Sequence, residues 1–177
     1  MAGQGERLKG LRYRTRVRPA DREAVRELVA TAGVFSDAEV AIALELVEAR
    51  LAQGARSGYA FLFAELPGAA ADLVVGYACF GPIPATVASY DLYWLVVRPA
   101  YRGLGLGTAL LARSEAWVRR RGGKRLYVET SSRPAYAPTR AFYCARGYRE
   151  VAVLPDYYAP GDAKVIYVKL LSSQAAC

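Results

Sequence analysis

The chain reads VVRPAYRGLGLGT from Val96 to Thr108. An apolar strand runs into an arginine and three alternating glycines, which open directly into an amphipathic helix. Glycines let the backbone approach a ligand closely, and the first turn of a helix offers unpaired N–H groups and partial positive charge. Such helix starts bind phosphate groups, and Arg102 adds a cation beside them. The stretch therefore predicts a loop that holds a pyrophosphate.

The spacing within this loop distinguishes two kinds of nucleotide site. Arg-x-x-Gly-x-Gly at Arg102, Gly105 and Gly107, between a strand and a leucine-rich helix, resembles the acetyl-CoA loop of the GNAT acetyltransferase superfamily. A dinucleotide-binding loop instead expects Gly-x-Gly-x-x-Gly, and counting from Gly103 puts Thr108 at the third glycine position. A glycine-rich turn without a ligand is the third interpretation. The spacing favours the acetyl-CoA loop.

Length and composition predict a single globular domain. The chain has 177 residues, 54% of them hydrophobic, and a mean hydropathy of +0.09. We expect one domain over residues 1–177, with its core in about residues 10–171. No apolar run approaches the ~20 residues of a membrane span, and the opening residues MAGQGER lack the apolar segment of a signal peptide. We therefore expect a cytoplasmic protein that does not enter a membrane.

The lack of histidine narrows the chemistry. With no His in the chain, proton transfer has to use carboxylates, tyrosines, lysines, cysteines or water. The cysteines Cys79, Cys144 and Cys177 have no metal-ligand spacing, and an odd number in an intracellular chain argues against a disulfide framework. We expect no metal site.

The net charge of +8 favours an anionic partner. Coenzyme A is itself a polyanion and accounts for part of this charge. The basic residues gather in two groups, and we interpret both as solvated faces rather than as a nucleic-acid site. The first group alternates with apolar residues along an expected strand, and the second surrounds the end of the helix after the glycine loop, where cations complement the helix dipole. The groups are Arg12, Arg14, Arg16 and Arg18, and Arg119, Arg120, Arg121, Lys124 and Arg125.

Periodicity and helix-end signals predict the order of elements. Ser36 and Glu39 have the spacing of a capping box, and Gly122 and Gly147 follow the expected ends of two helices. We expect strands at residues 10–18, 59–66, 73–80, 89–98, 124–130, 148–154 and 164–171, and helices at residues 19–31, 36 to about 51, 106–121 and 138–146.

This order of elements is the one that GNAT enzymes use, so the resemblance extends from about residue 10 to residue 171. Residues 141–148, AFYCARGY, also resemble the Phe-Tyr…Gly-aromatic segment of the superfamily. The resemblance implies an α/β (α+β) GNAT fold, with a central mixed, mostly antiparallel sheet and helices on both faces. It also implies an acetyl-CoA-dependent N-acetyltransferase.

The resemblance places acetyl-CoA at the glycine loop. It implies that backbone N–H groups of residues 103–108 hold the pyrophosphate, and that the pantetheine arm enters where strand 89–98 splays from strand 124–130. An exposed N–H near Val96 or Val97 would then polarise the thioester oxygen as an oxyanion hole. The expected cofactor-binding residues are Val96, Val97, Arg102, Gly103, Leu104, Gly105, Leu106, Gly107 and Thr108.

Two carboxylates are candidates for the general base. An alkyl amine has a pKa near ~10, so most of it is protonated at neutral pH. Asp91 is an acid in an otherwise apolar strand, which is costly unless the acid is paired or functional. It falls where some GNAT enzymes carry a glutamate base, and it would act through a water; an arginine or backbone N–H partner is the alternative. Glu129, at the end of the next strand, is the second candidate, or it binds the acceptor's ammonium group or caps Ser131 and Ser132.

Tyr143 is the expected general acid. A phenol can donate to the CoA thiolate, whose thiol has a pKa near that of cysteine, ~8.5, and the resemblance gives the Phe-Tyr tyrosine this role. A core tyrosine on a short amphipathic helix is the alternative. Tyr136 departs from the pattern, because many relatives have an asparagine there that contacts CoA. Cys144 adjoins Tyr143, but no histidine is present to activate it, so we expect direct transfer without an acetyl-enzyme.

The acceptor is the part that the sequence determines least. Acceptor contacts in GNAT enzymes usually come from the region between the first two helices and from the last hairpin. The substrate-binding candidates are therefore Phe35, Tyr93, Tyr157 and Tyr158, the last two in an expected hairpin loop over residues 155–164. We expect a small amine or amino-acid-like acceptor. The alternatives are a protein or peptide N-acetyltransferase and a non-catalytic acyl-CoA sensor; many relatives dimerise, so a homodimer fits the resemblance.

Overall fold

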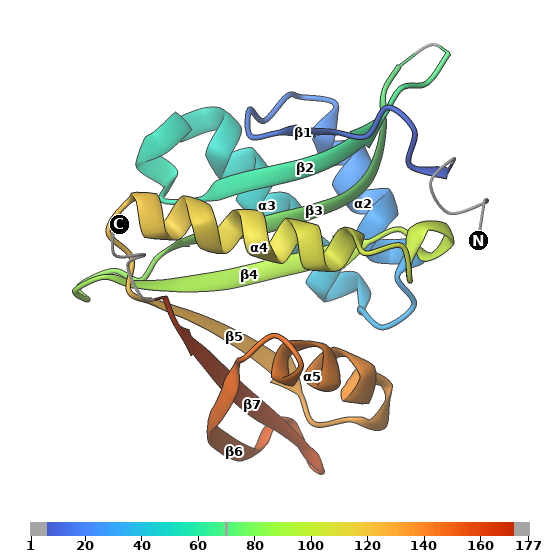
Figure 1. Ribbon diagram of the computed structural model, residues 1–177. Helices are drawn as coiled ribbons and strands as arrows, with labels where there is room; N and C mark the ends of the chain where they lie inside the picture. The colour runs from blue at the N-terminus through green and yellow to red at the C-terminus, as the bar shows by residue number, and fades with distance from the viewer. Residues whose placement is uncertain (1–6, 70, 172–177) are drawn as a thin grey trace. The chain divides into compact units, whose positions relative to one another are not determined.

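The computed structural model describes residues 7–69 and 71–171. Cys177 and most of the amino-terminal segment considered above lie outside these residues. The elements follow the order that the sequence predicts (Figure 1). They are β1 (Arg12–Arg14), α2 (Asp21–Thr31), α3 (Asp37–Gln53), the 3-10 helix η1 (Gly54–Ser57), β2 (Ala60–Leu66), β3 (Leu73–Pro82), β4 (Ser89–Val97), η2 (Pro99–Tyr101), α4 (Leu106–Arg120), β5 (Arg125–Ser131), η3 (Pro134–Tyr136), α5 (Ala137–Cys144), β6 (Arg149–Ala159) and β7 (Asp162–Leu170).

The strands form a seven-stranded sheet in the order β1-β2-β3-β4-β5-β7-β6. The pairs β1/β2, β2/β3, β5/β7 and β6/β7 are antiparallel, and β4/β5 is parallel. The mixed, mostly antiparallel sheet is therefore confirmed. No helix within the described residues is long and apolar enough to cross a membrane.

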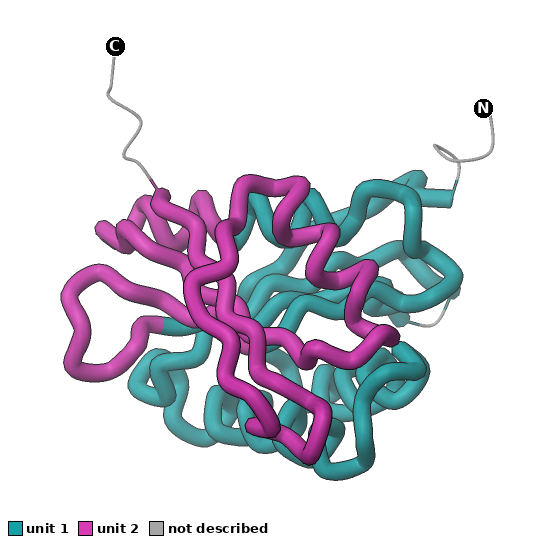
Figure 2. Tube along the Cα trace, turned by 90° about the horizontal axis from the view of Figure 1, so that it is seen from below, with its two compact units in different colours: residues 1–81, 94–114 teal, residues 82–93, 115–177 magenta. Residues whose placement is uncertain are grey.

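Two compact units divide these elements, and Figure 2 shows them in different colours. Unit 1 comprises Met1–Gly81 and Trp94–Ser114, and unit 2 comprises Pro82–Tyr93 and Glu115–Cys177. Strand β4 and helix α4 each contribute residues to both units. The expectation of a single domain stays a prediction.

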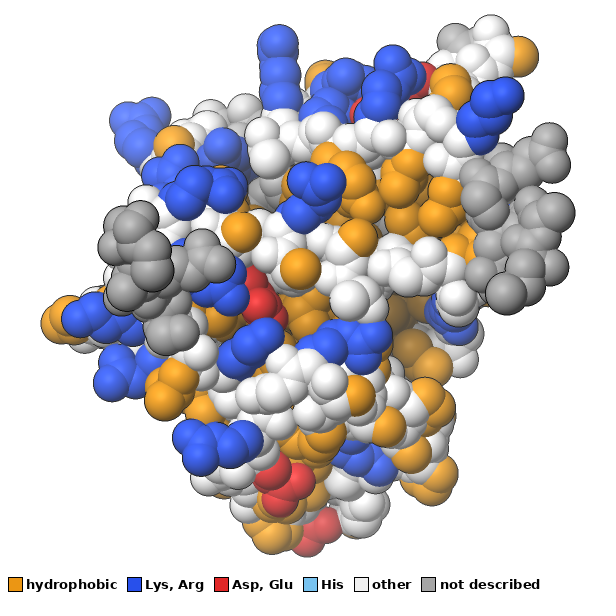
Figure 3. Space-filling model, in the orientation of Figure 1, with side chains coloured by type: hydrophobic (Ala, Val, Ile, Leu, Met, Phe, Trp, Pro, Cys, Tyr) orange, Lys and Arg blue, Asp and Glu red, His pale blue; other side chains and the backbone are white. Residues whose placement is uncertain are grey.

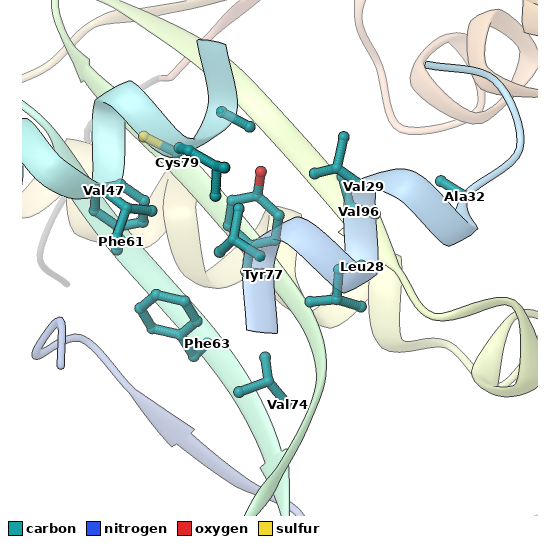
Figure 4. Packing of buried hydrophobic residues seen from close by; sticks show 13 residues of the cluster. Leu28, Val29, Ala32, Val47, Phe61, Phe63, Val74, Tyr77, Cys79 and Val96 are labelled. Atoms are coloured by element: carbon teal, nitrogen blue, oxygen red, sulfur yellow. The ribbon is translucent and has the colours of Figure 1, made fainter. Parts of the chain in front are cut away.

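The core of unit 1 lies between its helices and the sheet. Helix α2 buries Val25, Leu28 and Val29 completely, as their helical spacing predicts. Figure 4 shows side chains of α2 and α3 packed with those of β2 and β3 in one cluster. Tyr77 belongs to that cluster, and its neighbour Gly76 faces the opposite side of β3, where a Cβ would lie 3.1 Å from Leu110 Cδ1 of α4. Unit 1 therefore has helices on both faces of its strands, as expected.

The predicted helix-end signals are present. The Glu39 N–H donates to Ser36 Oγ (3.3 Å), and the Ser36 N–H donates to Glu39 Oε2 (2.7 Å), which completes the capping box of α3. Gly122 and Gly147 follow α4 and α5 with φ of 80° and 81°, a left-handed conformation that glycine adopts readily at helix ends.

The first strand is shorter than the expected residues 10–18, and its arginines do not form one solvated face. Strand β1 pairs with β2 only over three residues. The Arg14 guanidinium, in a side chain 10% exposed, lies 2.7 Å from the Asp21 carboxylate and 2.6 Å from that of Glu65. Both carboxylates are buried and need a counter-cation. Burial alone would raise the pKa of Glu65, but the hydrogen bond and the charge of Arg14 lower it below its ordinary value.

Replacing Arg14 by Met should therefore lower the free energy of unfolding by about 3 kcal/mol, because it leaves two buried carboxylates without their cation. The matched control is Arg12→Met, since Arg12 is 61% exposed and pairs with Asp72, and it should cost less than about 1 kcal/mol. Urea denaturation at neutral pH measures both. The loss in R14M should shrink below about pH 4, because a carboxylate with a lowered pKa stabilises the fold only above its titration range. Equal losses in the two variants would contradict the assignment.

Candidate active site

In unit 1, the glycine loop (residues 98–108) connects β4 to α4. Gly103 and Gly105 have φ of +75° and +83°, and a Cβ at either position would meet nothing within 4 Å. The loop thus needs glycine for its left-handed backbone rather than for close packing. The space beside these two glycines is open.

The start of α4 suits an anion. The N–H of Ala109 donates to the carbonyl of Gly105 (3.0 Å), so the N–H groups of Leu106 and Gly107 precede the regular helical hydrogen bonds. The first turn of α4 holds no acidic residue. The partial positive charge of this helix end is therefore not cancelled within the turn, and phosphate groups fit such a position.

Two arginines fix the loop to the end of α2 within unit 1. Arg98 donates to both carboxylate oxygens of Glu27, at 2.9 and 3.0 Å. Arg102 donates to the carbonyls of Val97 (3.2 Å) and Ala32 (3.0 Å). Because carbonyls are uncharged, the positive charge of Arg102 is not neutralised by these bonds. Its expected role beside a pyrophosphate stays a prediction.

The end of β4 supplies further side chains to unit 1. Val96 is buried in the core, and the register of β4 with β5 ends earlier, at Leu92. The expected role of Val96 and Val97 in polarising a thioester stays a prediction. Phe35 packs edge-on against Trp94, with ring centroids 5.0 Å apart. Phe35 is one of the predicted substrate-binding residues, whereas Trp94 was not predicted, although it is an aromatic residue next to Tyr93 in the sequence.

In unit 2, the sheet register brings two of the predicted carboxylates to one face. Asp91 is paired with Tyr127 of β5, and Glu129 lies two residues further along β5. Paired residues, and residues two apart on a strand, share a face. On β7, Lys164 is paired with Ser131 and so faces the same side. Its ammonium nitrogen lies 2.6 Å from Glu129 Oε2.

Asp91 is half-buried and has an unusual proton affinity. Burial raises its pKa to about 6, and the charge of Glu129 adds to this rise, whereas Lys164 opposes it. A carboxylate that titrates close to neutral pH is suited to accept and release protons there. Of the two base candidates, Glu129 is held in an ion pair by Lys164, and Asp91 has the raised pKa described above.

The last hairpin differs from its prediction. Strands β6 and β7 extend to Ala159 and from Asp162, so the turn is residues 160–161 and not residues 155–164. The register of β6 with β7 shifts between Leu154 and Ala159, and β6 is an edge strand, which tolerates Pro155. Tyr157 and Tyr158 therefore lie on β6.

Both tyrosines lie beside Lys164, which was predicted only as part of that loop. The ammonium of Lys164 lies 3.9 Å from the ring centroid of Tyr157 and 5.9 Å from that of Tyr158. Unit 2 thus joins Asp91, Glu129, Tyr157 and Tyr158 in one group around Lys164.

Tyr143 belongs to a different part of unit 2. It is buried on α5, with its ring centroid 5.4 Å from that of Tyr148. Burial raises the pKa of Tyr143 above its ordinary value, so the phenol stays protonated and can donate. Tyr136, at the start of the same helix, is also buried, and the Arg133 guanidinium lies over its ring at 5.4 Å.

The open glycine turn at the start of α4 in unit 1 suits an anionic group, and Asp91 in unit 2 is a carboxylate whose pKa is raised to about 6. The family model described as the acetyltransferase (GNAT) family matches residues 23–148. A crystal structure of a GNAT-family protein from Desulfovibrio desulfuricans is 43% identical, with a TM-score of 0.87, and the match covers 92% of this chain and 99% of that one. The chain therefore belongs to the GNAT acetyltransferase family.

Two further similar proteins are an enzyme named for its activity and a protein solved with its cofactor. An N-alpha-acetyltransferase of Sulfurisphaera tokodaii is 31% identical over 109 residues, which cover 58% of this chain and 64% of that protein. The chain spans 64% to 65% of the length of the curated relatives that it matches. A Salmonella typhimurium protein with the same fold (TM-score 0.68, 24% identity, covering 94% of this chain and 97% of that one) was solved with its cofactor acetyl-CoA.

The pKa of Asp91 should respond in opposite directions to two substitutions. Glu129→Gln removes a charge that raises this pKa and should lower it, whereas Lys164→Met removes a charge that lowers this pKa and should raise it. Carboxyl carbon shifts in NMR titrations measure both changes. Lys169→Met is the matched control, because Lys169 lies on the other face of β7, opposite Leu126. Shifts of the same sign in E129Q and K164M would contradict the arrangement.

Proposed function

We propose that this chain is an acetyl-CoA-dependent N-acetyltransferase that moves the acetyl group directly to the primary amine of a small amine or amino-acid-like acceptor. The observation that carries the proposal is the left-handed glycine turn at the start of α4, where no acidic residue in the first turn cancels the partial positive charge of the helix end, in a chain that belongs to the GNAT family. Membership of the family supports acetyl transfer, and the group around Lys164 supports a small polar acceptor.

The glycine loop is the proposed site for the cofactor. The open space beside Gly103 and Gly105 leaves room for a pyrophosphate against the N–H groups of Leu106 and Gly107, with Arg102 as a nearby cation. When bound, acetyl-CoA supplies a thioester whose acetyl group an amine can attack. Solved relatives that contain acetyl-CoA or coenzyme A support this choice of cofactor.

Asp91 is the proposed general base, because Glu129 is engaged by Lys164. A free alkylammonium has a pKa near ~10, about four units above that of Asp91, so the carboxylate does not deprotonate it outright. The neutral fraction of the amine, whose first proton goes to solvent, attacks the thioester carbon through its lone pair. The nitrogen becomes far more acidic once it bonds to that carbon, and Asp91 then takes the second proton, directly or through a water. Asp91 thus completes the formation of the amide.

Tyr143 is the proposed partner of the leaving thiolate. The CoA thiol has a pKa near ~8.5, well below the raised pKa of this buried phenol. Full transfer of the phenolic proton would therefore be uphill. Tyr143 instead donates a hydrogen bond that stabilises the developing thiolate as the carbon–sulfur bond breaks, and solvent supplies the final proton.

Thiol release from acetyl-CoA, measured across alkylamines, amino acids, aminoglycosides and short peptides, tests this function. We expect release with one small-molecule class in the wild type, and loss of both CoA binding and release in Gly105→Ala. Gly122→Ala is the matched control, because Gly122 has φ of +80° and equally open surroundings at the other end of α4. Release with peptides alone would favour the N-alpha-acetyltransferase activity named for one relative. CoA binding without release would favour a sensor, and unchanged CoA binding in G105A would overturn the cofactor site.

Replacing Tyr143 by Phe should lower kcat about 10- to 100-fold while the Kd for acetyl-CoA stays unchanged, because only the bond to the thiolate is lost. Tyr148→Phe is the control: its hydroxyl bonds to Glu115 (3.1 Å) in the interior, so this change should reduce stability and leave kcat unaffected. Steady-state kinetics with calorimetric CoA binding measure the two effects. A parallel loss of kcat and CoA affinity in Y143F would remove the assignment.

A further inference from the structure

The ammonium group of Lys164 lies inside a small cage within unit 2. Glu129 binds it at 2.6 Å, and the ring centroids of Tyr157 and Tyr158 lie 3.9 and 5.9 Å from it. The two rings are nearly perpendicular, at 83°, with centroids 5.0 Å apart, so they form two walls. The side chain of Lys164 is only 12% exposed, although both tyrosines around it are about half exposed.

Carboxylates and aromatic faces together form the sites that bind alkylammonium ions. The ring quadrupole attracts a cation lying over its face, and a carboxylate balances the charge. Glu129 is 45% exposed, so a solute could reach it if Lys164 moved. Lysine has a flexible four-carbon stem and can leave such a position by rotation alone.

The local charge also favours a cation. The chain as a whole is strongly basic, and Lys and Arg side chains are more widespread than Asp and Glu side chains on the face shown in Figure 3. The group around Lys164 and the adjoining turn departs from this pattern, since its carboxylates outnumber its cations. The carboxylates are Asp91, Glu129, Asp156 and Asp162, and the cations are Lys164 and Arg133, which pairs with Asp162.

We propose that Glu129, Tyr157 and Tyr158 form an alkylammonium-binding site, which Lys164 fills in the free protein and from which the ammonium group of a cationic acceptor displaces it. The cation site stands on the geometry of this cage. Its identification as the acceptor's site rests on the proposed function, and it narrows the acceptor to alkylamines that bind as cations.

Displacement of Lys164 by the ligand explains why a lysine occupies a site whose ligand is also a cation. Without a cation, Glu129 would face Asp91 uncompensated across the sheet surface, which like-charge repulsion disfavours. Lys164 supplies the missing charge until a ligand arrives. It therefore competes with the ligand and weakens its apparent affinity, and removing Lys164 should strengthen binding.

Titration with n-butylammonium chloride, without acetyl-CoA, tests the cation site. The readout is the ring signals of Tyr157 and Tyr158 in NMR spectra of the wild type and of Lys164→Met. We expect K164M to bind the probe about tenfold more tightly than the wild type, the order of a desolvated cation–aromatic contact. Lys164→Gln should behave like K164M, which keeps the test valid if one variant is poorly folded. Equal binding by wild type and both variants would overturn the proposal.

Two controls separate the cage from a general effect of charge. Lys169→Met removes the same charge from the same strand, at a lysine bound to Glu115 on the other face, and should leave butylammonium binding unchanged. The double variant K164M/E129Q should not show the tighter butylammonium binding expected of K164M. A gain in K169M, or a gain that survives E129Q, would overturn the cage. If the probe binds as expected and yet no alkylamine is acetylated, the proposed function fails and the cation site remains.

Discussion

The turn from β4 into α4 requires left-handed backbone at Gly103 and Gly105, and this requirement governs the loop that we propose as the phosphate site. A side chain at either position would be strained even though there is room for it. The room that no side chain fills is left to a ligand. Arg98, bound to Glu27, and Arg102, bound to two carbonyls, hold the turn against α2. The loop is therefore formed before a cofactor binds, which reduces the entropy that binding costs.

Two lysines on β7 show how surroundings decide the role of a residue type. Lys169 contacts both oxygens of Glu115, which is buried and also bound by Arg119. Lys164 makes the same kind of ion pair with Glu129, but that carboxylate is about half exposed and the neighbouring rings are open to solvent. In the first pair the carboxylate, in a side chain 6% exposed, is out of reach of a solute. The second is accessible to exchange with a solute.

Local sequence signals predicted the fold well, because they act within a few residues. The glycine turn, the capping box at Ser36 and the helix-ending Gly122 and Gly147 placed the helix ends that they mark within two residues of those observed. Predictions failed where distant partners decide. Arg14 was assigned to a solvated face because nothing near it in sequence reveals Glu65, 51 residues away. The ion pair of Lys164 with Glu129 was not predicted, since it depends on the register of β5 with β7.

The cation paired with Glu129 also bears on how Asp91 would work as the proposed base. The negative charge of one carboxylate raises the pKa of another near it, and a large rise makes the second a poor base at neutral pH. Lys164 pairs with Glu129 and opposes this rise, and the pKa of Asp91 is raised to about 6, mainly by burial. An acceptor ammonium that replaces Lys164 brings the same charge to the same carboxylate. The exchange would therefore keep a positive charge on Glu129, so that acceptor binding would not expose Asp91, the proposed base, to the uncompensated charge of that carboxylate.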